Sequence, residues 1–350
     1  MPESAITPPP LDPTPIFDLA RGNFTTEFLG AAVGHFRVFE LLAEGPLGFT
    51  ELAQRLGLAE RAANVLLTAL RAMGLLGRDE QGRLHLTPLA REHLLPGQPF
   101  DVSGYVHLAS GGPGTAQLVE RLRTNQPAAA KPNEGAAFIY RAGIESAMDE
   151  ADSARRLTLA LAGRAKVVAP YLARQIDLAG VRCLLDVAGG TGLYAIACVQ
   201  ALPGLRAIVF DRPEVLKICA EYAERHGVAD RIDCVAGDMF SDPLPPADAV
   251  LLSNVLHDWD VPTCEQLLAR CVALLPPGGA VHVHDVFLDD DLGGPLPIAL
   301  YSAALFSLTE GRAYSAAEYR AMLTRVGLVP EPTIRPTLVH CGILTGRKPA

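Results

Sequence analysis

The segment LLDVAGGTG, residues 184–192, decides the fold of this chain. An apolar run ends at Asp186; Gly189, Gly190 and Gly192 follow it, and the helix-forming segment LYAIACVQAL comes next. Glycines let the backbone turn tightly and approach a bound ligand closely. The segment therefore predicts a strand, a glycine turn and a helix, with Asp186 at the carboxyl edge of a sheet.

Further β-branched runs alternate with helical segments after this turn. They are RAIVFD (206–211), RIDCVAG (231–237), ADAVLLSN (247–254) and AVHVHDVF (280–287). Such alternation predicts a parallel sheet built from βαβ units. The last stretch, residues 332–348, contains two extended runs with no helix between them, as in a closing antiparallel hairpin. We expect an α/β, Rossmann-like domain over residues 179–350.

The first half of the chain has a helical pattern. Residues 1–15 carry six prolines and predict a loose arm. Residues 16–100 predict a winged-helix-like dimerisation domain, because the helical segments 51–58 and 62–74 are followed by a candidate two-stranded wing that turns at Gly82. Residues 101–178 predict a helical linker that caps the substrate.

A winged helix raises the possibility of a DNA-binding regulator. The segment at the position of a recognition helix, residues 58–76, has few basic residues and many leucines, which favours dimer packing or a core. The apolar residues Phe24, Phe28, Val38 and Phe39 exceed what a small helical unit needs to bury. We therefore expect a homodimer formed through these helices.

Composition excludes several classes of function. A net charge of −9 and an isoelectric point near 5.5 give no general attraction to nucleic acid or anionic lipid. The sequence shows neither a secretion signal nor a run of apolar residues long enough to span a membrane, so we expect a cytoplasmic protein. The seven cysteines contain no C-x-x-C pair and predict reduced thiols in the core.

The glycine turn alone leaves two cofactors open. Residues 190–195 also fit the dinucleotide pattern G-x-G-x-x-G/A, and Asp211 at the end of the second strand could hold a ribose in either case. A nicotinamide dehydrogenase is therefore an alternative from a different class of enzyme.

Four segments in order narrow the choice: LLDVAGGTG (184–192), VFDRPEVL (209–216), AGDMF (236–240) and LLSNVLHDWD (251–260). Together they resemble the motifs of class I methyltransferases and, more narrowly, of the dimeric small-molecule O-methyltransferases. The resemblance implies S-adenosylmethionine as the cofactor, with Gly189 beside its methionine part, Asp211 on the ribose hydroxyls, and Asp238 with Met239 at the adenine. The cofactor site implied in this way also includes Asp186, Gly190, Gly192, Arg212, Gly237, Phe240, Ser253 and Trp259.

This sequence departs from the family pattern at two positions of the cofactor site. Ala188 stands where relatives usually have glycine, a change that we expect to cost little. Ser253 stands where many relatives have lysine, so the cofactor carboxylate needs another partner. Arg164 is the candidate, because a guanidinium on an otherwise apolar helix normally has an anionic partner; a surface arginine is the alternative.

The chemistry requires a base if the acceptor is a phenol, because a phenol with a pKa near ~10 is mostly protonated at neutral pH. His257 directly follows the fourth strand, at the sheet edge where ligands bind. The resemblance points to the same residue. Asp285 is the expected acid partner and Glu310 the second candidate; a further acid found in relatives appears here as Ala316. Asp258 and Asp260 could cap the next helix, and Trp259 could pack or cover the adenine.

We expect methyl transfer to a hydroxyl, phenolic in kind, on a small aromatic or polyketide-like metabolite. Carbon methylation of a 2-oxo acid, with His257 and Asp285 as metal ligands, is the alternative within the family. Successive side chains of a strand point to opposite faces, so His282 and His284 share one face of the predicted strand and Asp285 lies on the other. The acceptor pocket should draw on residues 100–170 and 301–308.

Overall fold

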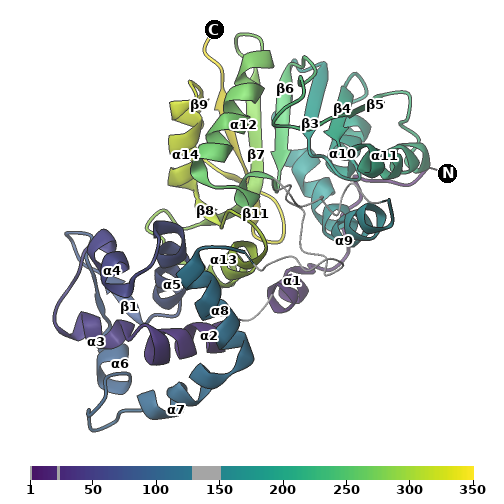
Figure 1. Cartoon of the computed structure of the whole chain (residues 1–350). Coiled ribbons are helices and arrows are strands. Elements are labelled where there is room, and N and C mark those ends of the chain that lie inside the picture. Colours follow the sequence, from purple (N-terminus) through teal and green to yellow (C-terminus); the bar gives the residue numbers. More distant parts are fainter. Residues whose placement is uncertain (1, 22–23, 128–150) are drawn as a thin grey trace. The chain divides into compact units, whose positions relative to one another are not determined.

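The computed structural model describes residues 2–21, 24–127 and 151–350. It divides into two compact units (Figure 1). The sheet unit comprises residues 1–17, 130–287 and 316–350, and the helical unit comprises residues 18–129 and 288–315. No helix within the described residues is long and apolar enough to cross a membrane.

The sheet unit contains the predicted parallel sheet with its closing hairpin. Its main strands lie in the order β5-β4-β3-β6-β7-β11-β10; β3 to β7 pair in parallel, and β11 pairs antiparallel with β7 and β10 (Figure 1). The bounds are β3 (Cys183–Val187), β4 (Arg206–Asp211), β5 (Ile232–Ala236), β6 (Ala249–Ser253), β7 (Ala280–Leu288), β9 (Val329–Pro330), β10 (Arg335–Pro336) and β11 (Cys341–Arg347). The chain reverses its order after β5, so the carboxyl ends of β3 and β6 meet at the switch point where open α/β sheets bind ligands.

Helices flank this sheet. They are α9 (Ala151–Gln175), α10 (Leu193–Ala201), α11 (Pro213–Arg225), η3 (Leu256–Asp258), α12 (Val261–Leu274) and α14 (Ala316–Arg325). Helix α9 packs against α10 and α11. It therefore belongs to the sheet unit, although it precedes the predicted boundary at residue 179. Part of the predicted linker, residues 128–150, is outside the described residues.

The helical unit includes a segment from late in the chain. Its elements are α2 (Thr25–Gly30), η1 (Ala31–His35), α3 (Val38–Ala43), α4 (Phe49–Leu56), α5 (Glu60–Ala72), β1 (Leu76–Arg78), β2 (Leu84–Leu86), α6 (Pro88–His93), α7 (Ser103–His107), η2 (Leu108–Gly111), α8 (Pro113–Thr124), α13 (Leu296–Leu308) and β8 (Tyr314–Ser315); α1 (Thr14–Ala20) contains the boundary between the units. Helix α13 packs on α5. Residues 288–315 of the predicted catalytic domain, residues 179–350, thus group with the helical unit.

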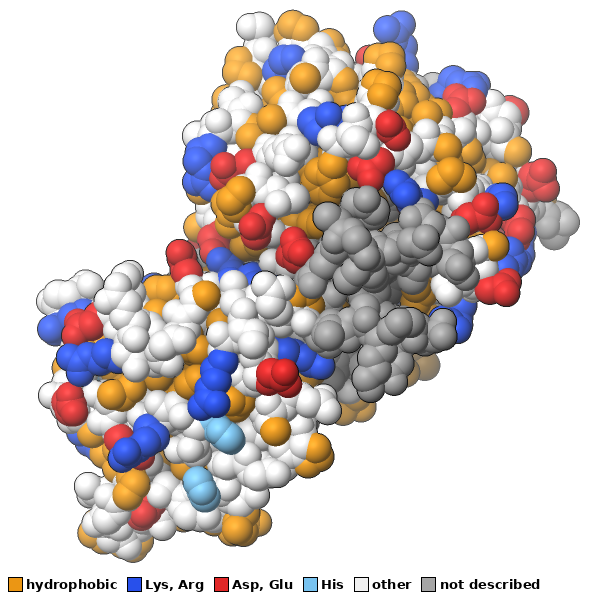
Figure 2. All heavy atoms as spheres, viewed as in Figure 1, with side chains coloured by type: hydrophobic (Ala, Val, Ile, Leu, Met, Phe, Trp, Pro, Cys, Tyr) orange, Lys and Arg blue, Asp and Glu red, His pale blue; other side chains and the backbone are white. Residues whose placement is uncertain are grey.

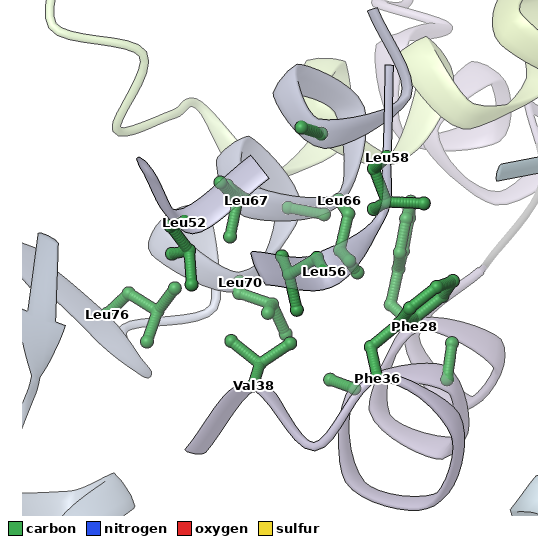
Figure 3. Close-up of a cluster of buried hydrophobic side chains, with 14 of the residues drawn as sticks. Phe28, Phe36, Val38, Leu52, Leu56, Leu58, Leu66, Leu67, Leu70 and Leu76 are labelled. Carbon is green, nitrogen blue, oxygen red and sulfur yellow. The ribbon is translucent and has the colours of Figure 1, made fainter. Parts of the chain in front are cut away.

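The apolar residues expected at a dimer surface lie instead in the core of the helical unit. Phe28, Val38 and Phe39 have no exposed surface, and Figure 3 shows Phe28 and Val38 among the leucines of α4 and α5. Helix α13 contributes Ala303 and Phe306 to the same cluster. The sequence interpretation was wrong about these side chains because the helix that helps to cover them comes from a distant part of the chain.

The predicted hairpin is present, since β1 and β2 pair antiparallel and Gly82 between them has a positive φ of 78°. The side chains of α5 do not form a DNA-reading surface. Arg61 donates to the carbonyls of Thr309 and Gly311, and Arg71 donates to Asp291. On the face of the helical unit in Figure 2, basic side chains lie among acidic and apolar ones. These observations weigh against the regulator alternative.

The start of the N-terminal arm is attached to the sheet unit, contrary to expectation. The Ala5 N–H donates to Gln200 at 2.7 Å, and the Gln200 amide donates to the Glu3 carbonyl at 2.9 Å. The Glu3 N–H donates to the Arg225 carbonyl, and Ala5 is buried in the core of the sheet unit. Proline composition predicted the absence of a helix correctly, but extended backbone can still dock through its own polar groups.

The cysteines form no disulfide, as expected. Cys198, Cys219, Cys264, Cys271 and Cys341 are buried. Cys234 is exposed and Cys183 is partly exposed, so the prediction of core positions was wrong for these two. Cys183 is the first residue of β3, and Cys234 lies on β5 at the edge of the sheet, so each is covered by fewer neighbours than a residue inside the sheet.

Candidate active site

The glycine turn between β3 and α10 leaves no room for a side chain at two of its positions, Gly189 and Gly192. A Cβ atom at Gly189 would lie 2.8 Å from the Asp186 carboxyl group and from Val209, and one at Gly192 would lie 2.7 Å from the Cys219 sulfur. Gly192 also has a positive φ of 69° and is the N-cap of α10. The turn therefore brings backbone and the first helical turn close to the end of β3, as the sequence predicted.

Ala188, which precedes this turn, has a φ of 53°. A left-handed backbone costs a residue with a Cβ about 1–2 kcal/mol, so the exchange of glycine for alanine is more costly than we expected. The Ala188 N–H donates to the Phe210 carbonyl at 2.8 Å, and this contact between β3 and β4 holds the strained backbone in place.

Replacing Ala188 with glycine should raise the free energy of unfolding by about 0.5–1 kcal/mol, because relief of the left-handed strain exceeds the entropy cost of glycine. Equilibrium denaturation measures this. Ala220→Gly on the exposed side of α11 is the matched control and should lose about 1 kcal/mol. A destabilised Ala188→Gly variant would show that the backbone is not strained.

Asp186 is fully buried beneath the turn. Neither of its carboxyl oxygens has a hydrogen-bond partner of ordinary geometry among the described residues. Burial and the nearby charge of Asp211 raise the pKa of Asp186 to about 8, and the Ala195 N–H offsets only part of this. A buried carboxyl group without a partner is expected where a ligand supplies one, so the residues present fit a polar or cationic group at this position.

Asp211 ends β4 beside the turn. Its Oδ2 accepts the Gly190 N–H at 2.8 Å, and its Oδ1 accepts the Arg212 N–H at 2.7 Å. Burial raises the pKa of Asp211, while these two hydrogen bonds and the charge of Arg212 oppose the shift. Each carboxylate oxygen can accept a further hydrogen bond, so the group is suited to a pair of ribose hydroxyls.

The residues predicted at the adenine lie together after β5. Asp238 accepts the Phe240 N–H at 2.8 Å, and its other oxygen lies 3.2 Å from the Arg212 guanidinium. The Phe240 ring meets the Trp259 ring edge to face, with 4.8 Å between centroids. A Cβ atom at Gly237 would lie 2.4 Å from the Phe210 ring. Trp259 therefore packs on Phe240, and its role over the adenine stays a prediction, as do those of Asp238 and Met239.

Ser253 ends β6 in a network of polar side chains. Its Oγ lies 2.8 Å from Nδ1 of His284, and the Asn254 amide donates to it at 3.1 Å. The positive charge of Arg164 on α9 contributes a lowering of the pKa to four groups at this edge of the sheet: Tyr194, His257, Asp258 and His284. The fold therefore brings Arg164 to the same sheet edge, which is consistent with the role predicted for it.

His257 and Asp285 form a buried pair across the ends of β6 and β7. His257 lies in the short helix η3, and its Nδ1 is 2.6 Å from Oδ1 of Asp285. The side chains are 5% and 1% exposed, so solvent competes little with this contact. Asp260 caps α12 by accepting the Thr263 N–H, whereas an oxygen of Asp258 lies 3.6 Å from Nε2 of His257.

The electrostatics of the pair favour a basic imidazole. Burial lowers the pKa of His257, but the carboxylates of Asp285 and Asp258 outweigh burial and raise it above its ordinary value. For Asp285, burial raises the pKa, and His257 together with three hydrogen bonds lowers it overall. Asp285 is therefore ionised at neutral pH. For the neighbouring Asp258, burial raises the pKa to about 6.

His282 and His284 have structural roles on the other side of β7. His282 bonds to Thr345, and His284 bonds to Ser253 and Thr337. Burial lowers the pKa of each to about 3, so both are neutral. Within the described part of the chain, no group of three or more His, Cys, Asp or Glu residues could hold a metal ion.

Three further residues concern the acids that were predicted to orient His257. Tyr319 donates its hydroxyl to Oδ2 of Asp285 at 2.9 Å, a contact that the sequence interpretation missed. The only signal for it is an aromatic residue at an apolar helix position, which ordinarily indicates core packing. Ala316 is buried and supplies no acid. Glu310 belongs to the helical unit, and its role as the second acid stays a prediction.

The sheet has a glycine turn after β3, an acid at the end of β4 and a histidine–acid pair formed by η3 and β7. This is the arrangement expected of a class I S-adenosylmethionine-dependent methyltransferase, and the family matches confirm that class. Residues 126–329 match the O-methyltransferase domain, and residues 17–95 match the O-methyltransferase dimerisation domain. The chain belongs to this family of O-methyltransferases. The dehydrogenase and regulator alternatives are therefore wrong.

Three relatives illustrate the similarity. The chain is 37% identical over 335 residues to 3-hydroxy-5-methyl-1-naphthoate 3-O-methyltransferase of Streptomyces sahachiroi, covering 95% of this chain and 94% of the relative. An O-methyltransferase family 2 protein of Planctomyces limnophilus, solved in complex with apigenin, is 49% identical with a TM-score of 0.87, covering 99% of each chain. Human N-acetylserotonin methyltransferase, solved with S-adenosylmethionine, is 26% identical with a TM-score of 0.58, covering 96% and 97%.

Proposed function

We propose that this O-methyltransferase acts on a phenolic hydroxyl of a fused aromatic metabolite and that His257 is its general base. The observation that supports the base most directly is the 2.6 Å contact between His257 and a buried, ionised Asp285. An imidazole held in this way by a carboxylate resembles the base of other enzymes that deprotonate a hydroxyl.

The pair would act through the tautomer that it selects. Since Nδ1 donates to Asp285, the lone pair of the neutral ring is at Nε2, which takes the proton of the acceptor hydroxyl as the oxygen attacks the methyl carbon. The imidazolium formed is stabilised by the charge of Asp285. When bound, S-adenosylmethionine supplies the activated methyl group, and alignment lowers the barrier further.

The cofactor would be held by the residues around the glycine turn. Asp211 would accept the ribose hydroxyls, and the buried Asp186 lies where the cationic methionine part would give its carboxyl group a partner. Ionisation of Asp186 would then be favoured by the bound cation, since an opposite charge nearby favours the charged form.

The proposed acceptor class comes from the relatives. One carries a name for methylation of a hydroxynaphthoate, and another was solved with apigenin, a flavone. Both compounds are flat and phenolic. We infer a similar acceptor, partly apolar and with an acidic hydroxyl.

Mass spectrometry of the products tests the reaction. The purified protein, S-adenosylmethionine and either apigenin or a 3-hydroxynaphthoate should give a product with one added methyl group, and the same acceptors with their hydroxyls blocked as methyl ethers should give none. A methylated product from the blocked acceptor, lost on chelation and restored by added metal, would favour carbon methylation instead.

We further propose that the chain is a homodimer, because the matched dimerisation domain ends within an exposed apolar segment. In the segment 89–108, five large apolar or aromatic residues are 46–79% exposed; they are Leu89, Phe100, Val102, Tyr105 and Leu108. Exposed apolar groups in this number usually mark an interface.

Replacing Tyr105 and Leu108 together with aspartate should convert the dimer to monomer, because burying two uncompensated charges opposes association. Light scattering at micromolar concentration measures the mass. Val329→Asp, which alters a comparably exposed apolar residue of the sheet unit, is the control and should remain dimeric. A wild-type monomer, or a dimer unaffected by the double substitution, would remove this surface from the account.

A further inference from the structure

Tyr319 on α14 makes a hydrogen bond to the His257–Asp285 pair. It has no exposed surface, and its hydroxyl donates to Oδ2 of Asp285 at 2.9 Å. Its ring packs edge to face on Phe287 with 5.6 Å between centroids, so the ring is fixed independently of the hydroxyl.

Asp285 has no solvent to complete its hydrogen bonding, because the side chain is only 1% exposed. Its Oδ1 is shared by the Val286 N–H at 2.8 Å and His257 at 2.6 Å. Tyr319 supplies a donor to Oδ2. Without this donor, Oδ2 would be a buried charged oxygen that lacks its partner, and the carboxylate could rotate or take up a proton.

We propose that Tyr319 is a positioning residue for the methyl transfer, which fixes the Asp285 carboxylate and thereby orients His257. The three side chains form one buried chain of hydrogen bonds from α14 through β7 to η3. This inference rests on the proposed role of His257 as the base. Tyr319 need not touch the substrate, since it acts only through Asp285.

The chain of contacts also predicts how the base responds to pH. The Tyr319 hydroxyl stabilises the ionised Asp285, so its removal makes the His257–Asp285 pair hold its proton more tightly. The free base then forms only at higher pH. The other charged groups that act on His257, Asp258 and Arg164, are unchanged by this substitution.

The test is Tyr319→Phe, which keeps the ring and removes only the hydroxyl. We expect kcat to fall about tenfold near neutral pH, as for loss of a hydrogen bond to a charged group, with an unchanged KM for S-adenosylmethionine. The acid limb of the kcat–pH profile should move to higher pH by roughly half a unit to one unit. Tyr222→Phe, at a buried tyrosine of α11 outside this site, should change neither.

A double substitution separates positioning from a general effect on packing. In the Asp285→Asn background, Tyr319→Phe should change kcat by less than about twofold, because residues that act as a unit are not additive. A full tenfold loss in that background, or a wild-type profile for Tyr319→Phe, would overturn the proposal. If His257→Ala is inactive while Tyr319→Phe behaves as wild type, only the role of Tyr319 fails; if His257→Ala has wild-type kcat, both fail.

Discussion

Replacing His257 with alanine should lower kcat by about 10²- to 10⁴-fold, the usual contribution of a general base. The affinity for S-adenosylhomocysteine should be nearly unchanged, because the glycine turn and Asp211 lie on other elements than His257. Single-turnover kinetics measure the first quantity and calorimetry the second. In this one variant, kcat should therefore fall while the affinity for S-adenosylhomocysteine stays the same.

His226→Ala is the matched control. The His226 side chain is 5% exposed, the same fraction as that of His257, and it contacts the N-terminal Glu3 rather than the candidate site. It should keep wild-type kcat even if its stability falls. A His257→Ala variant with wild-type kcat would leave alignment alone as the source of the rate.

Asp211→Ala should weaken cofactor binding, since each charge-assisted hydrogen bond to a ribose hydroxyl contributes at most ~1.5–3 kcal/mol. The structure adds a second reason. The carboxylate also accepts the N–H groups of Gly190 and Arg212, so the substitution loosens the turn itself. Calorimetry with S-adenosylhomocysteine measures the change in affinity.

Asp233→Ala is the control for that measurement, because Asp233 lies exposed on β5 and pairs with Arg206 away from the turn. It should leave the affinity unchanged. If Asp211→Ala folds and binds S-adenosylhomocysteine as tightly as the wild type, the ribose assignment is wrong.

The sequence predicted the parts of this fold that depend on local pattern. The glycine turn, the acids at the strand ends and the parallel order follow from short motifs, because a strand, a turn and a helix are specified by neighbouring residues. The pairing of His257 with Asp285 was also predictable, since His257 follows β6, Asp285 lies in the carboxyl half of the neighbouring β7, and these strand ends share one edge of the sheet.

The largest failures concern contacts between distant parts of the chain. Phe28 and Phe39 were expected at a dimer surface because α13, which helps to bury them, lies more than half the chain away. The docking of Glu3 on α11 and the bond from Tyr319 to Asp285 join segments whose own sequences carry no mark of their partners. Tertiary packing decides such positions.

The central claim, that His257 removes the acceptor proton, is tested most directly by kcat as a function of pH in the wild type and in His257→Ala. In the wild type, kcat should rise with pH through a pKa above the ordinary histidine value, because Asp285 and Asp258 raise the pKa of His257. The deficit of the variant should shrink as the pH approaches the pKa of the acceptor, where solvent supplies the phenolate. Two results would contradict the account: a deficit of the variant that stays constant up to that pH, or a loss of wild-type activity when chelators are added.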